Sequence, residues 1–322
     1  MARLASGIPL SEDARAQAKP ASLLGPLIEA TKPGITRLVT VTSTVGFVLA
    51  ASARTWKLTE LLVIGLSCMA GTALSAAGAN AINQWMEADR DALMDRTRNR
   101  PLPSGRATPF AVLSSGIALS VVGVLVLALL TNWVAAAISA TCVLVYVFIY
   151  TPMKPRTTLS TLVGAIPGAL PPLIGWVAAA EGSPLAELTR WGGWSLFTLM
   201  FVWQIPHFLA IAWMYRDDYA KGGYKVLPVV EDGERRTAST VIRWTLLLIP
   251  ATLAPAWLLP VQLGWVYIAI AGVTAGVFCT LAYQLVRGRT RAEARAVFFF
   301  SIAHLPLIMG AMVVETLVRV LL

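Results

Sequence analysis

Charge is scarce in this 322-residue sequence. Only 13% of its residues are Asp, Glu, Lys or Arg, whereas 57% are hydrophobic and the mean hydropathy is +0.68. Soluble domains carry about a quarter of their residues as charged side chains, so this composition excludes a soluble globular protein. It is typical of an integral membrane protein, whose fold must be explained in a lipid environment rather than in water.

Cysteine and histidine are also rare. The three cysteines, Cys68, Cys142 and Cys279, lie far apart inside apolar segments, which excludes a disulfide framework and a zinc site. The only histidines are His207 and His304, both inside apolar segments. A histidine within a membrane span is costly and is therefore a functional candidate. The alternative is an imidazole that merely bonds a neighbouring helix.

The N-terminal region lacks an apolar run before Leu23, and its basic residues are mixed with Glu12 and Asp13. This pattern predicts neither a cleavable signal peptide nor a transit peptide. We expect residues 1–30 to be a polar, disordered tail and residues 31–322 to be a single membrane-embedded domain. A bacterial inner membrane is the simplest location.

Long apolar segments are abundant, most of them near the ~20 residues that a spanning helix needs. Together they predict an all-α integral membrane protein with nine transmembrane helices in a bundle around a central cavity. The predicted spans are 35–52, 61–86, 110–130, 133–151, 160–180, 193–214, 241–261, 264–286 and 296–321.

The distribution of Lys and Arg sets the orientation. With a cytoplasmic N-terminus, the opposite side of the membrane holds only Arg54, Lys57, Arg190 and Arg319. The positive-inside rule therefore predicts that the N-terminus is cytoplasmic and the C-terminus lies on the other side. The net charge of +9 is a topology signal. It indicates no nucleic-acid partner, because the basic residues are dispersed over loops.

A dense charged stretch, residues 83–106, follows the second apolar segment. If the helix continues through it, the four-residue spacing places Asn83, Glu87, Asp91 and Asp95 on one gently drifting face. Carboxylate and amide oxygens suit a hard cation such as Mg²⁺, and the arginines just beyond can clamp a diphosphate. The alternative is a solvated, charge-laced loop.

A second charged stretch follows the sixth apolar segment and contains Asp217, Asp218, Tyr219 and Lys221. It is predicted on the same membrane face as the first, at a similar point in the other half of the chain. The two acidic clusters are therefore expected to meet across a central cavity. A short basic turn with Lys154 and Arg156 could close over a bound phosphate, or be a plain positive-inside loop.

These residues resemble a known family. The pattern Asn83-x-x-x-Glu87-x-x-x-Asp91, followed by Arg96-Thr97 and Arg100-Pro101-Leu102-Pro103-Ser104-Gly105, is similar to the first acidic motif of the UbiA-type intramembrane prenyltransferases. Asp217-Asp218-Tyr219 occupies the place of their second motif. Within that superfamily, Tyr150-Thr151-Pro152-Met153-Lys154, the Gly164–Trp176 run and Trp203-Gln204-Ile205-Pro206-His207-Phe208 resemble the protohaem IX farnesyltransferases. The sequence departs from the pattern at Ser160, where asparagine is usual, and at Glu87, where aspartate is common.

The resemblance implies a reaction between farnesyl diphosphate and haem b that gives haem O and diphosphate, with Mg²⁺ as the cofactor. It also implies downstream partners, a haem A synthase or oxidase assembly proteins, besides the lipid bilayer. The active site is expected to face the cytoplasm. The residues assigned to catalysis are Asn83, Glu87, Asp91, Asp217, Asp218 and Lys154, with Glu87, Asp91 and Asp218 as metal ligands. Those assigned to substrate binding are Arg96, Arg100, Arg156, Tyr219, Lys221, His207 and His304.

Two other functions remain open at the level of sequence. An aromatic, quinone-type prenyltransferase would share the acidic clusters and the fold, but gives no reason for a histidine in the sixth span. A secondary transporter also has many spans with broken helices. Its site is expected near the membrane midplane, whereas here the ionisable residues gather at one face.

Overall fold

The structure is a computed structural model that describes residues 24–322. Residues 1–23, most of the predicted tail, lie outside the described residues. Residues 24–30 form a short helix, α2 (Leu24–Ala30), rather than part of a disordered tail. The Gln84 side chain donates a hydrogen bond to the carbonyl oxygen of Ala30, and Ala30 is fully buried, so α2 is fastened to the bundle.

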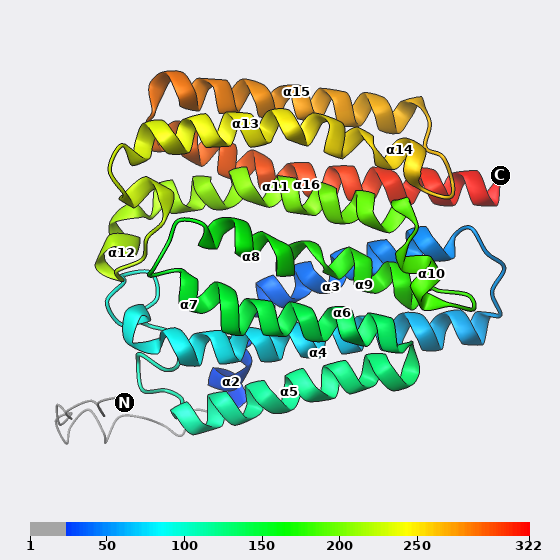
Figure 1. The fold of residues 1–322 in the computed structure, drawn as a ribbon, viewed down its shortest axis with the longest axis horizontal. Coiled ribbons are helices and arrows are strands. Elements are labelled where there is room, and N and C mark those ends of the chain that lie inside the picture. The colour runs from blue at the N-terminus through cyan, green and yellow to red at the C-terminus, as the bar shows by residue number, and fades with distance from the viewer. Residues whose placement is uncertain (1–23) are drawn as a thin grey trace.

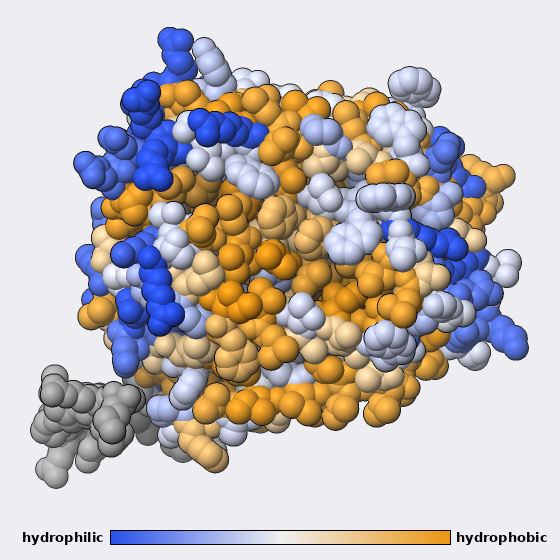
Figure 2. Space-filling view, viewed as in Figure 1, coloured by the Kyte–Doolittle hydropathy of each residue, from blue (hydrophilic) through white to orange (hydrophobic). Residues whose placement is uncertain are grey.

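Within the described residues, nine segments are long and apolar enough to cross a membrane, which confirms the predicted number. All are helical, and they run side by side (Figure 1). Hydrophilic side chains gather at the two ends of the molecule and apolar ones cover the band between them (Figure 2). The spans are α3 (Pro33–Ala51), α4 (Leu58–Asp91), α5 (Pro109–Leu130), α6 to α7 (Trp133–Met153), α8 and α9 (Ser160–Ala178), α11 (Trp191–Met214), α13 and α14 (Gly233–Leu258), α15 (Trp265–Gly288) and α16 (Arg291–Leu321).

Three spans are built from consecutive pieces. The fourth comprises α6 (Trp133–Leu144), the π-helix η1 (Val145–Tyr150) and α7 (Thr151–Met153). The fifth changes from α8 (Ser160–Ala169) to α9 (Pro171–Ala178), because Pro171 lacks the N–H that a continuous helix needs. The seventh comprises α13 (Gly233–Leu253) and α14 (Pro255–Leu258), and short elements α10 (Pro184–Leu188), α12 (Arg216–Lys221) and η2 (Leu227–Val229) lie in the loops.

Several helices extend beyond the apolar segments that predicted them. The helix α4 continues to Asp91, α13 begins at Gly233 and α16 begins at Arg291. Hydropathy marks only the part of a helix that lies in hydrocarbon, whereas the backbone hydrogen bonds continue into the polar region. The end of α4 at Asp91 leaves Asp95 beyond the helix, so Asp95 does not share the face of Asn83, Glu87 and Asp91.

Small residues set the position of α4. A Cβ atom on Gly78 would lie 2.4 Å from the carbonyl oxygen of Gly116, so the backbones of α4 and α5 touch at this point. A similar contact joins α9 to α3, where a Cβ atom on Gly175 would overlap the carbonyl group of Ser43. Close approach at small residues is how membrane helices gain packing energy. These contacts give the acidic face of α4 a rigid support.

Candidate active site

The helices enclose a cavity of about 370 Å³. At its polar end, four cationic side chains line the wall: Lys32, Arg96, Arg100 and Lys154. The remainder of the lining is mainly apolar and comes from α3, α4, α6, η1, α8, α9 and α11. The cavity therefore joins a positively charged mouth to an apolar interior.

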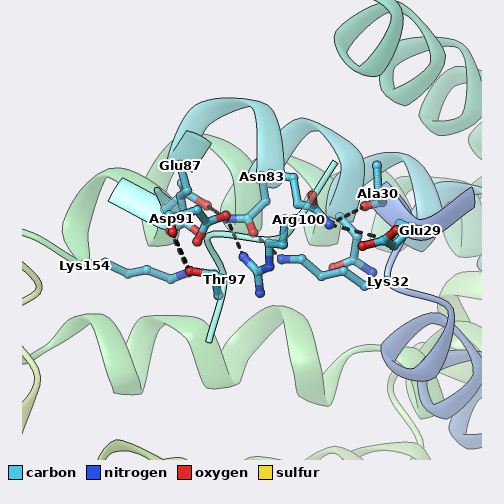
Figure 3. A network of polar contacts seen from close by, with 12 residues as sticks. Glu29, Ala30, Lys32, Asn83, Glu87, Asp91, Thr97, Arg100 and Lys154 are labelled. Atoms are coloured by element: carbon cyan, nitrogen blue, oxygen red, sulfur yellow. Dashed lines mark hydrogen bonds and ion pairs between the residues drawn. The ribbon is translucent and has the colours of Figure 1, made fainter. Parts of the chain in front are cut away.

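Three predicted residues lie behind the cations on one face of α4. Asn83, Glu87 and Asp91 are all nearly inaccessible to solvent. Lys154 donates to Glu87 with an Nζ–Oε1 distance of 2.7 Å, and Arg100 donates to Asp91 with an Nη1–Oδ2 distance of 2.7 Å. Figure 3 shows these side chains together at the end of α4. Two of the predicted diphosphate-binding cations are thus held in place by the predicted acidic residues.

Asn83 joins three elements of the mouth. Its Oδ1 atom accepts from Lys32 Nζ at 2.5 Å, and its Nδ2 atom donates to Thr151 Oγ1 at 2.8 Å. These contacts define the orientation of the amide. Burial, together with the charges of Arg100 and Lys154, lowers the pKa of Lys32 to about 7, although Glu87 acts in the opposite direction.

Lys154 lies in an aromatic environment. Its Nζ atom is 4.6 Å from the ring centroid of Tyr150 and 5.8 Å from that of Tyr224. Burial alone would lower the pKa of Lys154, but the adjacent carboxylate of Glu87 holds it well above its usual value. The buried hydroxyl of Tyr224 has no hydrogen-bond partner among residues 24–322. Lys154 therefore remains positively charged at the mouth of the cavity.

The two charged loops are in direct contact, rather than facing each other across the cavity. Asp218 accepts hydrogen bonds from the backbone N–H groups of Asp95 and Arg96, at 3.4 and 3.2 Å. Lys221 pairs with Asp95 at 2.6 Å, and this bond lowers the pKa of Asp95 and raises that of Lys221. The second loop thus holds the backbone that carries Arg96.

Arg96 is also held through its side chain. Its guanidinium group lies 5.1 Å from the ring centroid of Tyr215 and 5.9 Å from that of Tyr219. Cation–π contacts at these distances favour a fixed guanidinium. Tyr219, predicted as a substrate-binding residue, therefore reaches the site through Arg96.

Three predicted side chains lie outside both the cavity and the contacts described above. Asp217 is exposed and pairs with the neighbouring Arg216, and Arg156 is exposed. His304, predicted as a ligand contact, is fully buried on α16, with Phe278 packed edge-on at a centroid distance of 5.5 Å. It does not line the cavity, because its position on α16 directs it towards α15 instead. The structure therefore places these three residues outside the cavity.

His207 does line the cavity. Its ring is stacked between Trp203 and Phe298, and its Nδ1 atom lies 2.6 Å from Ser301 Oγ. The predicted histidine of the sixth span is therefore beside the cavity and in contact with the ninth span.

Known proteins are similar to this chain in sequence and in fold. Residues 39–303 match the UbiA prenyltransferase family. A protein of Solibacter usitatus named protoheme IX farnesyltransferase is 43% identical over 293 residues, which cover 89% of this chain and 97% of that protein. A protein of Anaeromyxobacter sp. with the same name is 40% identical over 302 residues, which cover 93% of this chain and 97% of that protein. The chain belongs to the UbiA prenyltransferase family.

Solved structures agree with this prenyltransferase fold. A digeranylgeranylglyceryl phosphate synthase superimposes with a TM-score of 0.73 at 16% identity, and the match covers 92% of this chain and 99% of that one. A UbiA homologue from Archaeoglobus fulgidus, described as bound to DMAPP and Mg²⁺, superimposes with a TM-score of 0.52 at 15% identity. That match covers 86% of this chain and 98% of the homologue.

Sequence reasoning missed several residues of this prenyltransferase site. The sequence position of Lys32 could have identified it as a site residue. A lysine at the start of a predicted span lies at the membrane edge, where the acidic stretch also begins. Tyr146 and Tyr150 line the cavity from the π-helix η1. A π-helix is rare and often occurs at functional sites, and no local sequence pattern predicts it. Tyr224 lies in the second charged loop, beyond the Asp217-Asp218-Tyr219 motif.

The donor set at α4 fits a hard divalent cation. Glu87 uses only Oε1 and Asp91 uses only Oδ2 in their ion pairs. Their other carboxylate oxygens form no hydrogen bond within the part of the chain that the structure describes. Oxygen donors one helical turn apart are the ligands that Mg²⁺ prefers. Among the described residues, no group of three acidic, histidine or cysteine side chains already converges as a metal site.

Proposed function

We propose that this prenyltransferase transfers the farnesyl group of farnesyl diphosphate to a vinyl group of haem b, giving haem O and diphosphate. In this reaction the allylic carbon–oxygen bond breaks and a carbon–carbon bond forms to the vinyl group. Water supplies the hydroxyl group of the product and releases a proton. The observation that carries the proposal is the cationic mouth that continues into an apolar cavity beside His207.

The cations of the mouth would bind the diphosphate. Lys32, Arg96, Arg100 and Lys154 converge on the same end of the cavity, and both arginines offer planar, bidentate donors for phosphate oxygens. Fixed positive charges at this position favour the breaking of the allylic bond, because negative charge develops on the leaving diphosphate. We assign substrate binding to these four side chains.

Glu87, Asp91 and Asp218 would hold Mg²⁺. When bound, the ion supplies positive charge to the diphosphate oxygens. Support comes from the spare carboxylate oxygens of Glu87 and Asp91 and from the homologue described as bound to DMAPP and Mg²⁺. Asn83 would orient the mouth through Lys32 and Thr151 rather than bind the metal.

The apolar interior would hold the fifteen-carbon chain. Pro171, Ile174 and Met200 lie on this part of the wall. An apolar lining excludes water and so protects an allylic cation from capture by water before the acceptor attacks. Haem b is favoured over an aromatic acceptor because His207 is beside the cavity, and because the two relatives carry the name protoheme IX farnesyltransferase.

The cellular setting follows from the same reasoning. The chain is a multi-pass membrane protein, and we propose that it resides in a bacterial inner membrane with the charged mouth on the cytoplasmic side. Lys and Arg are concentrated in the loops at that end. A downstream haem A synthase or oxidase assembly proteins would receive the product.

The direct test combines purified protein with haem b and farnesyl diphosphate and follows haem O by mass spectrometry. We expect haem O to form, and its formation to stop when a chelator removes divalent cations and resume when Mg²⁺ is restored. A parallel reaction with an aromatic quinone precursor should give no product. Prenylation of the aromatic compound without haem O would overturn the proposal.

A further inference from the structure

The ring of His207 is held on both faces. Trp203 stacks on one side with a centroid distance of 4.8 Å and an interplanar angle of 18°, and Phe298 stacks with 5.3 Å and 27°. Trp203 is itself fixed to α16, because its indole N–H donates to the carbonyl oxygen of Ser301 at 2.9 Å. The imidazole can therefore meet a ligand in the cavity only through its edge.

The hydroxyl of Ser301 decides which nitrogen of that edge carries the proton. Ser301 Oγ lies 2.6 Å from the carbonyl oxygen of Phe298 and 2.6 Å from Nδ1 of His207. A carbonyl oxygen can only accept, so the single hydroxyl hydrogen of Ser301 is donated to Phe298. The oxygen of Ser301 must then accept from His207, which places the imidazole proton on Nδ1.

The other nitrogen, Nε2, then carries a lone pair in the plane of the ring. It forms no hydrogen bond to any residue from 24 to 322, and His207 lines the cavity. A histidine that donates through one ring nitrogen and keeps the other as a lone pair has the arrangement of a metal ligand. The stacking of both ring faces disfavours a role in which the histidine packs flat against a vinyl group.

We propose that Ser301 is a positioning residue that fixes the tautomer of His207, and that His207 binds the iron of the haem acceptor through Nε2. This inference rests on the proposed function, and it names how the acceptor is recognised. Iron ligation at this point holds the porphyrin beside the cavity while the diphosphate occupies the cationic mouth. Binding of farnesyl diphosphate involves neither residue.

Ser195 provides a matched control. It is buried on α11, and its hydroxyl donates to the carbonyl oxygen of Gly192 at 2.7 Å, as Ser301 does to Phe298. Among the hydrogen bonds of the described residues, Ser195 has none to a histidine. Ser195→Ala therefore removes the same kind of helical hydrogen bond without altering His207.

The experiment titrates haem b into the purified full-length protein and follows the absorption and electron paramagnetic resonance spectra. In Ser301→Ala we expect haem affinity to fall about 10- to 100-fold, the usual cost of removing a partner of a metal-bound histidine. Ser301→Thr, which keeps the hydroxyl, should retain most of the affinity, and Ser195→Ala should match the parent. His207→Ala should lose the histidine-ligated spectrum and regain it when imidazole is added.

Two results would overturn the inference: a His207→Ala spectrum identical to that of the parent, or parental haem affinity in Ser301→Ala. All variants are also titrated with a non-hydrolysable farnesyl diphosphate analogue, whose affinity should stay within twofold of the parent and which reports correct folding. If the haem results are as expected but the parent forms no haem O, the proposed reaction fails while the ligation by His207 stands.

Discussion

Lys154 and Glu87 form a largely buried ion pair that links the end of the fourth span to α4. The Nζ–Oε1 distance is 2.7 Å, and the side chains are 17% and 6% exposed. A pair in this position has two roles, and a single mutation affects both at once. It holds two helices together, and in the proposed reaction it would present a lysine to the diphosphate and a carboxylate to Mg²⁺.

A double mutant should separate these roles. Removing one partner strands a buried charge, so Glu87→Gln and Lys154→Met should each lower thermal stability. The double variant Glu87→Gln/Lys154→Met has no stranded charge and should recover most of that stability. It should still lose at least a thousandfold in haem O formation, on the order of 4 kcal/mol. Thermal unfolding in detergent and rate measurements check the two expectations, and parental activity in the double variant would contradict the catalytic role.

The second prediction distinguishes Asp218 from Asp217, which are adjacent but differently placed. Asp218 accepts from two backbone N–H groups of the first loop, whereas Asp217 is exposed. Asp218→Asn keeps one acceptor oxygen but removes negative charge that the proposed Mg²⁺ site would use. We expect it to lose at least a hundredfold in turnover, with a weaker response to added Mg²⁺. Asp217→Asn should remain within twofold of the parent, and equal losses in the two variants would show that the contacts do not separate them.

The sequence predicted what depends on local pattern. Within residues 24–322, the nine predicted apolar segments correspond to nine spans. The four-residue spacing of Asn83, Glu87 and Asp91 correctly placed them on one face of α4. The expectation for Asp95 fell short because the helix ends at Asp91. Neither charge spacing nor hydropathy marks that end, since both sides of it are polar.

Contacts between distant parts of the chain could not be predicted. Lys32 meets Asn83 across 51 positions, and His207 meets Ser301 across 94. These pairs depend on how helices pack, which one sequence does not reveal. His304 shows the reverse case: a histidine in a span was a reasonable candidate, but its helix face turns it towards Phe278 and away from the cavity.

The third prediction concerns the support of α4. Gly78→Ala would place a methyl group 2.4 Å from the carbonyl oxygen of Gly116, a backbone atom that cannot move aside. Overpacking of this kind costs about 1–3 kcal/mol, so the free energy of unfolding should fall by that amount. Gly272→Ala is the control, because a Cβ atom there meets no atom within 4 Å. It should leave stability unchanged or raise it slightly, since alanine favours a helix. Equal stability of the two variants would contradict the close contact of α4 and α5.

The last prediction concerns pH. Burial and the nearby Arg100 and Lys154 lower the pKa of Lys32 to about 7, with Glu87 and Asp91 opposing that shift. The lysine is therefore charged below pH 7 and largely neutral above pH 8. A bound diphosphate favours the charged form, so its binding above pH 7 must take up a proton.

The affinity for a farnesyl diphosphate analogue should consequently fall as pH rises from 7 to 9, approaching tenfold per pH unit if only the charged lysine binds. Isothermal titration calorimetry in buffers with different ionisation enthalpies measures both the affinity and the proton uptake. Lys32→Arg is the matched control, because arginine keeps its charge throughout this range. Its affinity should change little between pH 7 and 9, with no proton uptake. Parallel pH profiles for the parent and Lys32→Arg would show that another group is responsible, because only the parent carries a side chain at position 32 that can lose its proton in this range.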